Sequence, residues 1–454
     1  MSQTMTADAA AAAAGRAASN GAGASEAGVP EAAPPASPRT TSRAEATART
    51  RANILAAASR LFIERGFSAV SVRDIATEAG LSHPGVLRHF GSKDDMLLEV
   101  VDGLAQQNAD WLETVDPGLG VFPELARHNA AIDGYIPLFS TLAGEATSTS
   151  HPAHGYFRDR HAGIRVQSAG LFQAAIDAGD LPAGTIAADE AARLAAAWDG
   201  LQLISIYLPG RFDLPDLLEA HLDRLRGRRP ATSLVQAPSG LPLFPLDTSD
   251  DAGYAPGRAR RLRIVADAST LFASRGFHAT SLREIAERVG ISKSTLLHHF
   301  SSKEELLGAV IARRDATLDL RSEFAMVGGD RLAMLEDLAE GARHAAQQEP
   351  GLVELYAVLS AEAAAPAHPG HAYFERRFDW AVDRFARLIA AAAPMLHDDL
   401  DPVFEALWLV ALWDGLQLQW LYDPEHVDVG EHLSAHLRSL VRPVEPVEPV
   451  EPVE

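Results

Sequence analysis

The stretches SVRDIATEAGLS at residues 71–82 and SLREIAERVGIS at residues 281–292 decide the fold. In each, a serine stands three residues before an acidic residue, which is the capping-box pattern that begins a helix. Gly80 and Gly290 then permit the sharp turn that ends this helix, and the following serine can cap the next one. Each stretch therefore predicts two short helices joined by a tight turn, the geometry that presents a second helix to the major groove of DNA.

Both stretches belong to a long internal repeat. Residues 51–100 align with residues 261–310 without a gap, and about half of the aligned positions are identical. Farther along, the hexapeptide Trp-Asp-Gly-Leu-Gln-Leu at 198–203 recurs unchanged at 413–418. The second half of the chain is therefore predicted to be a complete copy of the first, and a segment rich in Pro, Ser, Gly and Asp separates the two copies.

The apolar residues of each copy follow a helical period. Ile54, Ala58 and Leu61 recur at three-and-four spacing and no alternating strand pattern competes, so the fold class is predicted to be all-α. The start is almost entirely small residues and proline and the tail repeats Pro-Val-Glu, so both ends are expected to be disordered. The predicted segments are a disordered arm (1–45), a first helix-turn-helix domain (46–100), a first regulatory helical domain (101–227), a linker (228–257), a second helix-turn-helix domain (258–310), a second regulatory helical domain (311–441) and a disordered tail (442–454).

Charge is distributed unevenly along the chain. The formal net charge of −21 at first argues against a nucleic-acid partner. However, residues 49–93 hold seven basic and three acidic residues, and residues 258–303 hold nine basic and three acidic residues. These two basic segments, the heads, can exchange counterions with a phosphate backbone. The acidic remainder of the chain limits non-specific binding.

Several classes of protein are disfavoured. The chain has no cysteine, so disulfides, cysteine-based zinc sites and thiol chemistry are excluded. No apolar run approaches the roughly 20 residues that span a bilayer, and the start lacks the pattern of a secretory signal, so we expect a cytoplasmic protein with no membrane partner. We find no glycine-rich phosphate loop, nucleophile elbow or metal signature, and we therefore expect no enzymatic activity and no cofactor.

Both heads resemble the DNA-binding domain of the tetracycline-repressor (TetR) family of one-component regulators. The resemblance rests on the two quoted stretches, each followed by a second helix ending in His-Phe and then by Ser-Lys, and it covers some 50 residues in each copy. It implies three helices for DNA in each copy, followed by about six more that bind a small effector and form a two-helix dimerisation face.

The resemblance also implies which residues contact double-stranded DNA. The recognition helices would be residues 83–89 and 293–299, with Ser71, Ser281 and the helix-opening lysines on phosphates. The predicted DNA-binding residues are Ser71, Arg73, Ser82, His83, Gly85, Arg88, His89 and Lys93 in the first copy, and Ser281, Arg283, Ser292, Lys293, Ser294, Thr295, His298, His299 and Lys303 in the second.

The sequence departs from the family pattern in one respect, and the two heads differ from each other. Leu87 and Leu297 stand where the family commonly has a backbone-contacting tyrosine, so that contact is either lost or moved to Arg88 and His298. His-Pro-Gly opens the first recognition helix whereas Lys-Ser-Thr opens the second, so the two half-sites of a shared operator should not be identical.

The helices expected near residues 186–208 and 402–422 are unusually apolar, the second nearly all round, so each needs cover on two sides. With the following helices, about 214–227 and 429–441, they are predicted to form a four-helix interface between the copies. The covalent linker favours an intramolecular pseudo-dimer, with a homodimer of two chains as the alternative.

The sequence indicates the effector site less clearly than the DNA-binding residues. We expect a small apolar ligand, although aromatic residues at helical spacing are more often core than ligand contacts. The candidate pocket residues are Tyr135, Phe139, Phe157, Trp198, Tyr356, Phe374, Trp380 and Trp413. Two further sets, Glu145 with His151 and His154 and Glu362 with His368 and His371, have metal-ligand types, but their spacing across a proline-containing loop favours packing and capping, so no metal is predicted.

The expected function is repression by occupying an operator. Release would follow when an effector shifts the spacing of the two heads away from one helical repeat of about 34 Å. Activation remains an alternative, as does an effector-binding or protein-interaction module in which one or both heads are vestigial. DNA binding with a steep salt dependence would separate the regulator from that module.

Overall fold

The computed structural model describes residues 43–228, 234–240, 255–313, 331–348, 350–398 and 400–442. Nearly all of the predicted tail and of the N-terminal arm, and most of the predicted linker, lie outside these residues. Within them the elements are helices, apart from two isolated bridges that pair Phe212 with Val235 and Leu396 with Val441. The all-α prediction is therefore confirmed. No helix of the described ranges is both long enough and apolar enough to cross a membrane.

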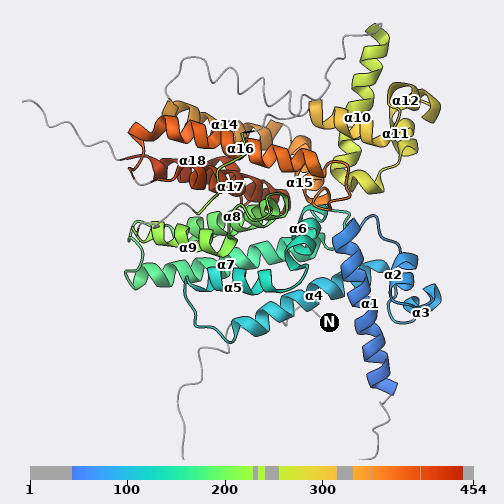
Figure 1. The fold of residues 1–454 in the computed structure, drawn as a ribbon, viewed down its shortest axis with the longest axis horizontal. Helices are drawn as coiled ribbons and strands as arrows, with labels where there is room; N and C mark the ends of the chain where they lie inside the picture. Colours follow the sequence, from blue (N-terminus) through green and yellow to red (C-terminus); the bar gives the residue numbers. More distant parts are fainter. Residues whose placement is uncertain are drawn as a thin grey trace, which may run out of the picture.

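The helices follow the same order in both copies (Figure 1). The first copy contains α1 (Arg43–Arg65), α2 (Val72–Glu78), α3 (His83–Leu87), α4 (Lys93–Leu112), α5 (Val121–Ala131), α6 (Tyr135–Glu145), α7 (His154–Asp177), α8 (Ala187–Tyr207) and α9 (Leu214–Leu225). The second contains α10 (Ala255–Ala279), α11 (Leu282–Val289), α12 (Lys293–His299), α14 (Arg331–Gln348), α15 (Pro350–Glu362), α16 (His371–Ala392), the short 3₁₀ helix η2 (Ala393–Met395), α17 (Pro402–Tyr422) and α18 (Val429–Leu440).

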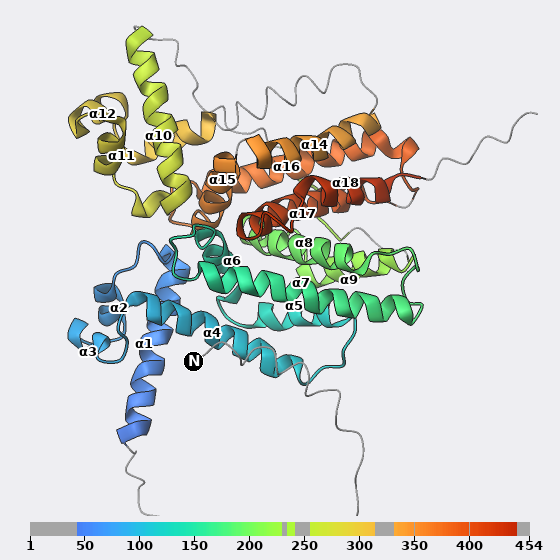
Figure 2. The same cartoon turned by 180° about the vertical axis from the view of Figure 1, so that it is seen from behind.

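The two heads, α1–α3 and α10–α12, lie on the same side of the molecule, and the remaining helices pack together behind them (Figure 1, Figure 2). The predicted capping boxes are present. The Asp74 amide donates to Ser71 Oγ at 3.3 Å while the Ser71 amide donates to Asp74 Oδ2 at 2.9 Å, and Ser281 with Glu284 repeats both bonds. Local sequence thus fixes where the second helix of each head begins.

The centre of the molecule is a close crossing of α8 and α17, which carry the repeated hexapeptide. A Cβ atom at Gly200 would lie 2.0 Å from the carbonyl oxygen of Ala411, and one at Gly415 would lie 1.8 Å from that of Ala196. Only glycine lets the two backbones approach this closely. The helices α6 and α15 cross nearby, where a Cβ at Gly144 would lie 2.0 Å from the Cβ of Ala361.

Two buried tyrosines extend from each copy into the other. The hydroxyl of Tyr207, at the end of α8, donates to the carbonyl of Ser360, and its ring lies 5.2 Å from that of Phe378. The hydroxyl of Tyr422, at the end of α17, donates to the carbonyl of Ala143. The two copies therefore exchange equivalent side chains across their contact.

The helices α9 and α17 add a polar and an aromatic contact between the copies. The guanidinium of Arg224 donates to the buried Glu405 at 2.6 Å, and the ring of His221 stacks on Trp408 with centroids 3.9 Å apart. Apolar residues of α8, α9 and the second copy form one continuous core, which explains why a helix as apolar as α17 is covered on all sides. The first head and α6 form a second core.

Candidate nucleic-acid interface

The second helix of each head is capped by a serine. The Gly85 amide donates to Ser82 Oγ at 3.2 Å, and the Thr295 amide donates to Ser292 Oγ at 3.0 Å. Helix α12 has the predicted length, whereas α3 ends at Leu87, two residues before the predicted end. Gly85 lowers the helix propensity of this short segment, which accounts for the earlier end.

Most predicted DNA-binding residues are accessible on the two heads. One buried apolar residue of each recognition helix, Val86 or Leu296, anchors it to the head. The exposed predicted residues are Ser71, Arg73, Ser82 and Arg88 in the first copy and Ser281, Arg283, Ser292, Lys293, Ser294 and His298 in the second, and the half-buried ones are His83, Gly85, His89, Lys93, Thr295, His299 and Lys303. The contacts themselves remain predictions.

Two of the basic residues counted in the heads stabilise the recognition helices instead of facing solvent. The guanidinium of Arg51 lies 4.2 Å from the ring centroid of Phe90, donates to the carbonyl of His89 and pairs with Glu99. Arg261 repeats the contact with the ring of Phe300, at 4.0 Å. The sequence alone does not indicate this role, because the contacts join helices that are distant in sequence.

The helix-opening lysines also contact the protein itself. Lys93 Nζ donates to the carbonyls of Phe67 and Val70, each at 2.8 Å, and lies 4.0 Å from the ring centroid of Phe67. Lys303 makes the same contacts with Phe277 and Thr280. An ammonium group has three donors, so at most one on each lysine is left for the predicted phosphate contact.

The heads differ in the pairing of one exposed arginine. Arg283 Nε donates to Glu287 Oε1 at 2.8 Å. In the first head the position of Glu287 is occupied by Thr77, and no described acidic group pairs with Arg73. Arg73 is therefore free to contact a phosphate without first breaking an ion pair.

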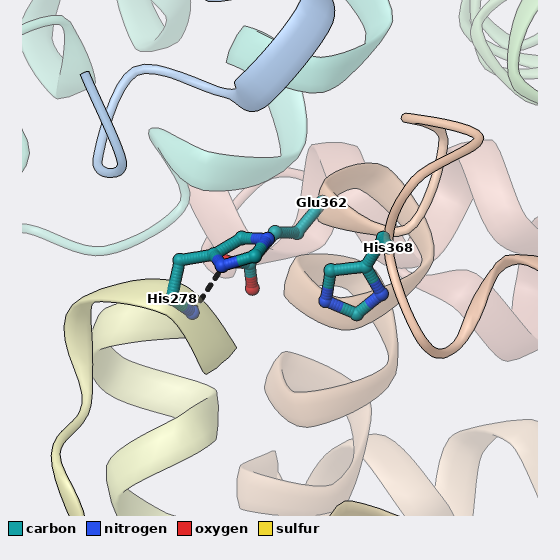
Figure 3. Close-up of side chains that lie close together, drawn as sticks. All are labelled: His278, Glu362 and His368. Carbon is teal, nitrogen blue, oxygen red and sulfur yellow. Dashed lines mark hydrogen bonds between the residues drawn. The ribbon is translucent and has the colours of Figure 1, made fainter. Parts of the chain in front are cut away.

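A buried carboxylate lies between each head and its regulatory helices. Glu362, at the end of α15, accepts hydrogen bonds from the amides of Phe277 and His278, the second at 2.7 Å (Figure 3). Glu145, at the end of α6, lies at the equivalent place near the amides of Phe67 and Ser68, but neither of its oxygens has a hydrogen-bond partner. Both carboxylates line a cleft of about 460 Å³ between the copies.

The histidines near these carboxylates act as helix caps. The Gly370 amide donates to His368 Nδ1 at 3.0 Å, which leaves the proton of the neutral ring on Nε2, the nitrogen that faces Glu362 in Figure 3. His278, Glu362 and His368 place one potential metal ligand each within 4.8 Å of one another, but coordination by His368 Nε2 would require that the cap be broken. His371 Nδ1 instead bonds the carbonyl of Ala363 at 2.8 Å.

The buried carboxyl group of Glu145 in this cleft should make the stability of the protein depend on pH. Burial, and then the charge of Glu362, raise the pKa of Glu145 from 4.5 to about 8. Since the folded state holds this proton more tightly than the unfolded chain, the stabilisation is complete below pH 4.5 and is lost as the pH rises towards 8. We expect the melting temperature to fall over this range by on the order of 5 °C, and to fall less in Glu145→Gln. Equal slopes for both proteins, measured by calorimetry, would contradict the assignment.

The predicted effector residues are only partly brought together. The ring of Phe139 lies 5.6 Å from that of Tyr135 and 5.1 Å from that of Phe157. In the second copy Tyr356 and Phe374 lie 5.5 Å apart. The tryptophans lie elsewhere, with Trp198 against Phe122, Trp413 against Phe385 and Trp380 beneath Arg384.

The fold and the heads define an all-α protein with two helix-turn-helix units in one chain. The family model described as bacterial regulatory proteins, tetR family, matches residues 54–100 and 264–310. The chain therefore carries two tandem matches to this family, one in each head.

Two curated relatives and one solved structure illustrate the similarity. The HTH-type transcriptional repressor Rv3405c of Mycobacterium tuberculosis is 39% identical over 105 residues, which cover 22% of this chain and 56% of that protein. The HTH-type transcriptional repressor KstR2 of Rhodococcus jostii is 34% identical over 111 residues, 24% of this chain and 52% of that protein. The chain thus spans about half the length of these relatives. The structure of the ketosteroid transcriptional regulator KstR2 of Mycobacterium tuberculosis aligns with 40% of this chain and 96% of its own, at 23% identity and a TM-score of 0.35.

Proposed function

We propose that the chain is a sequence-specific DNA-binding regulator that acts in the cytoplasm and represses transcription by occupying an operator with both heads. The observation that carries the proposal is the pair of capped, accessible recognition helices on one side of an otherwise acidic molecule (Figure 1). Basic side chains on these heads, Arg73 and Arg88 in one and Lys293 in the other, supply the phosphate contacts that dominate affinity.

A single chain is the proposed functional unit. The contacts that a family member would make with a second subunit are available within this chain, including the α8–α17 crossing, the exchanged tyrosines and the Arg224–Glu405 pair. An intramolecular partner is present at an effective concentration that reaches the millimolar range for a suitable linker. A homodimer of chains would have to displace these contacts.

The two half-sites of the operator are proposed to differ. The first recognition helix offers His83, Gly85 and Arg88, and the second offers Lys293, Thr295 and His298 at the same positions. Different side chains in the major groove select different base edges. The bound DNA should therefore be a pseudo-palindrome with one preferred orientation of the protein.

The test is footprinting of the purified protein on its own upstream DNA, with the mass of the complex measured in parallel by light scattering. One chain protecting two contacts separated by about one helical turn, with a steep loss of affinity as salt rises, supports the proposal. Two chains on the site would replace the pseudo-dimer by a four-headed assembly. Absence of protection at low salt would favour the module with vestigial heads.

A further inference from the structure

Two exposed leucines lie at equivalent positions of the two recognition helices. Leu87 is the last residue of α3, and Leu297 lies in the last turn of α12. Each is 40% exposed, whereas the residue before it, Val86 or Leu296, is fully buried and holds the helix against its head. Both leucines therefore lie on the outward side of the heads, among the residues proposed to bind DNA.

The leucines share a helix face with the residues that open each recognition helix. Side chains three or four positions apart lie on one side of a helix. Leu297 is four residues after the exposed Lys293, and Leu87 is three residues after the exposed Pro84. The opening residues of a recognition helix are the ones that reach base edges in the major groove. In the proposed complex the leucines face the same groove, one turn farther along the helix.

The chemistry of leucine limits what these side chains can contact on DNA. Leucine has neither a hydrogen-bond donor nor an acceptor in its side chain, so it cannot bind a phosphate or the polar edge of a base. The major-groove edge of a T·A pair carries one apolar group, the C5-methyl of thymine, whereas a G·C pair has no such methyl group. Contact between a leucine and this methyl removes apolar surface of both partners from water, which favours binding.

We infer that Leu87 and Leu297 each contact the methyl group of one thymine, at the same place in the two half-sites. The inference rests on the proposed function and adds a specificity determinant to it. The two heads lie on the same side of the molecule, so both leucines can face one operator (Figure 1). The half-sites are proposed to differ at the bases that face the first residues of the recognition helices. At the leucines the heads are identical, so a T·A pair should stand at the same distance from the operator centre on both sides.

The methyl group of thymine is small, so its expected effect is modest. Burying one group of this size corresponds to a factor of about four in affinity. Removing the methyl from one half-site should therefore weaken binding about fourfold. Removing it from both half-sites should weaken binding about 16-fold, since the two contacts are far apart and independent.

The test uses the full chain and the operator that footprinting locates. Each thymine of the protected region is replaced in turn by deoxyuridine, which pairs with adenine in the same way and lacks only the C5-methyl group. Titration of labelled DNA at fixed salt measures the affinity. The unmodified protein should lose about fourfold in affinity at a thymine in each half-site, and these two thymines should lie at equal distances from the operator centre.

The variants Leu87→Ala and Leu297→Ala assign each effect to one head. Each variant should become insensitive to the methyl group in its own half-site and keep the fourfold effect in the other. Both side chains are exposed and alanine favours a helix, so the fold should be retained, which circular dichroism checks. Val166→Ala is the matched control, because Val166 is 74% exposed on α7. It should leave the affinity and both methyl effects unchanged.

The inference is wrong if no thymine shows the effect in either half-site. It is also wrong if the leucine variants keep both methyl effects, because the leucines would then not touch the methyl groups. In both cases protection of the operator would leave the proposed regulator in place. Absence of protection by the unmodified protein at low salt would instead overturn the proposed function and, with it, this inference.

Discussion

Replacing Gly200 and Gly415 together by alanine is expected to destabilise the protein by about 3 kcal/mol or more, because each new methyl group adds to an already filled core. The clash is with backbone and not with a side chain that could rotate away, since the nearest atoms are the carbonyl oxygens of Ala411 and Ala196, at 2.0 and 1.8 Å. The helices α8 and α17 must then separate, which opens the core shared by the two copies. Urea unfolding, followed by circular dichroism, measures the loss.

The matched control is Gly170→Ala. Gly170 lies within α7, and a Cβ there would meet nothing within 4 Å. Alanine favours a helix over glycine by about 1 kcal/mol, so this variant should unfold at a higher urea concentration. If the double variant unfolded like the control, the close crossing of α8 and α17 would be wrong.

Reversing the charge of one head is expected to weaken operator binding by roughly 100- to 10,000-fold, because the second head then acts without the gain of a linked partner. The proposed variant is Arg73→Glu with Arg88→Glu. Both side chains are exposed on the first head, and neither forms an ion pair with a described residue, so the fold should be retained. Titration of labelled operator DNA at fixed salt measures the effect.

Arg438→Glu provides the control for this variant. It lies on α18, a helix on the side of the molecule away from the heads (Figure 1). Its exposed side chain pairs with Glu431. Its effect on operator affinity should stay below about threefold, since only long-range charge is altered. If the first-head variant bound no more weakly than this control, the first head would be vestigial and the operator would be bound by the second head alone.

The parts of the fold that depend on short-range sequence could be predicted. Capping by Ser71, Ser82 and their counterparts follows from residues three positions apart, and the structure has these caps. The apolar character of residues 402–422 likewise indicated a helix covered on several sides, and α17 is buried in this way. These features are encoded locally, so no knowledge of the packing was needed.

The contacts between distant residues could not be predicted. Arg51 and Lys93 were counted as charge for DNA, but they contact Phe90 and the carbonyls of Phe67 and Val70. Nothing in the sequence says that the tyrosine ending α8 inserts into the other copy. The aromatic residues predicted to hold an effector are for the same reason divided among several clusters. Of these residues, only Phe139 and Tyr356 line the small cavity between α6, α8, α15 and α17.

The crossing of α6 and α15 fits a first copy against a second copy better than it fits two identical copies. Gly144 leaves room for the single methyl group of Ala361, so two second copies would bring two methyl groups to a place that holds one, and two first copies would leave it empty. A pair made of identical subunits must fit itself and therefore looks the same from either direction along DNA. A chain whose two halves differ at their contact has no exact two-fold symmetry, so its two ends can be told apart. On the proposed operator such a chain would bind in one orientation only.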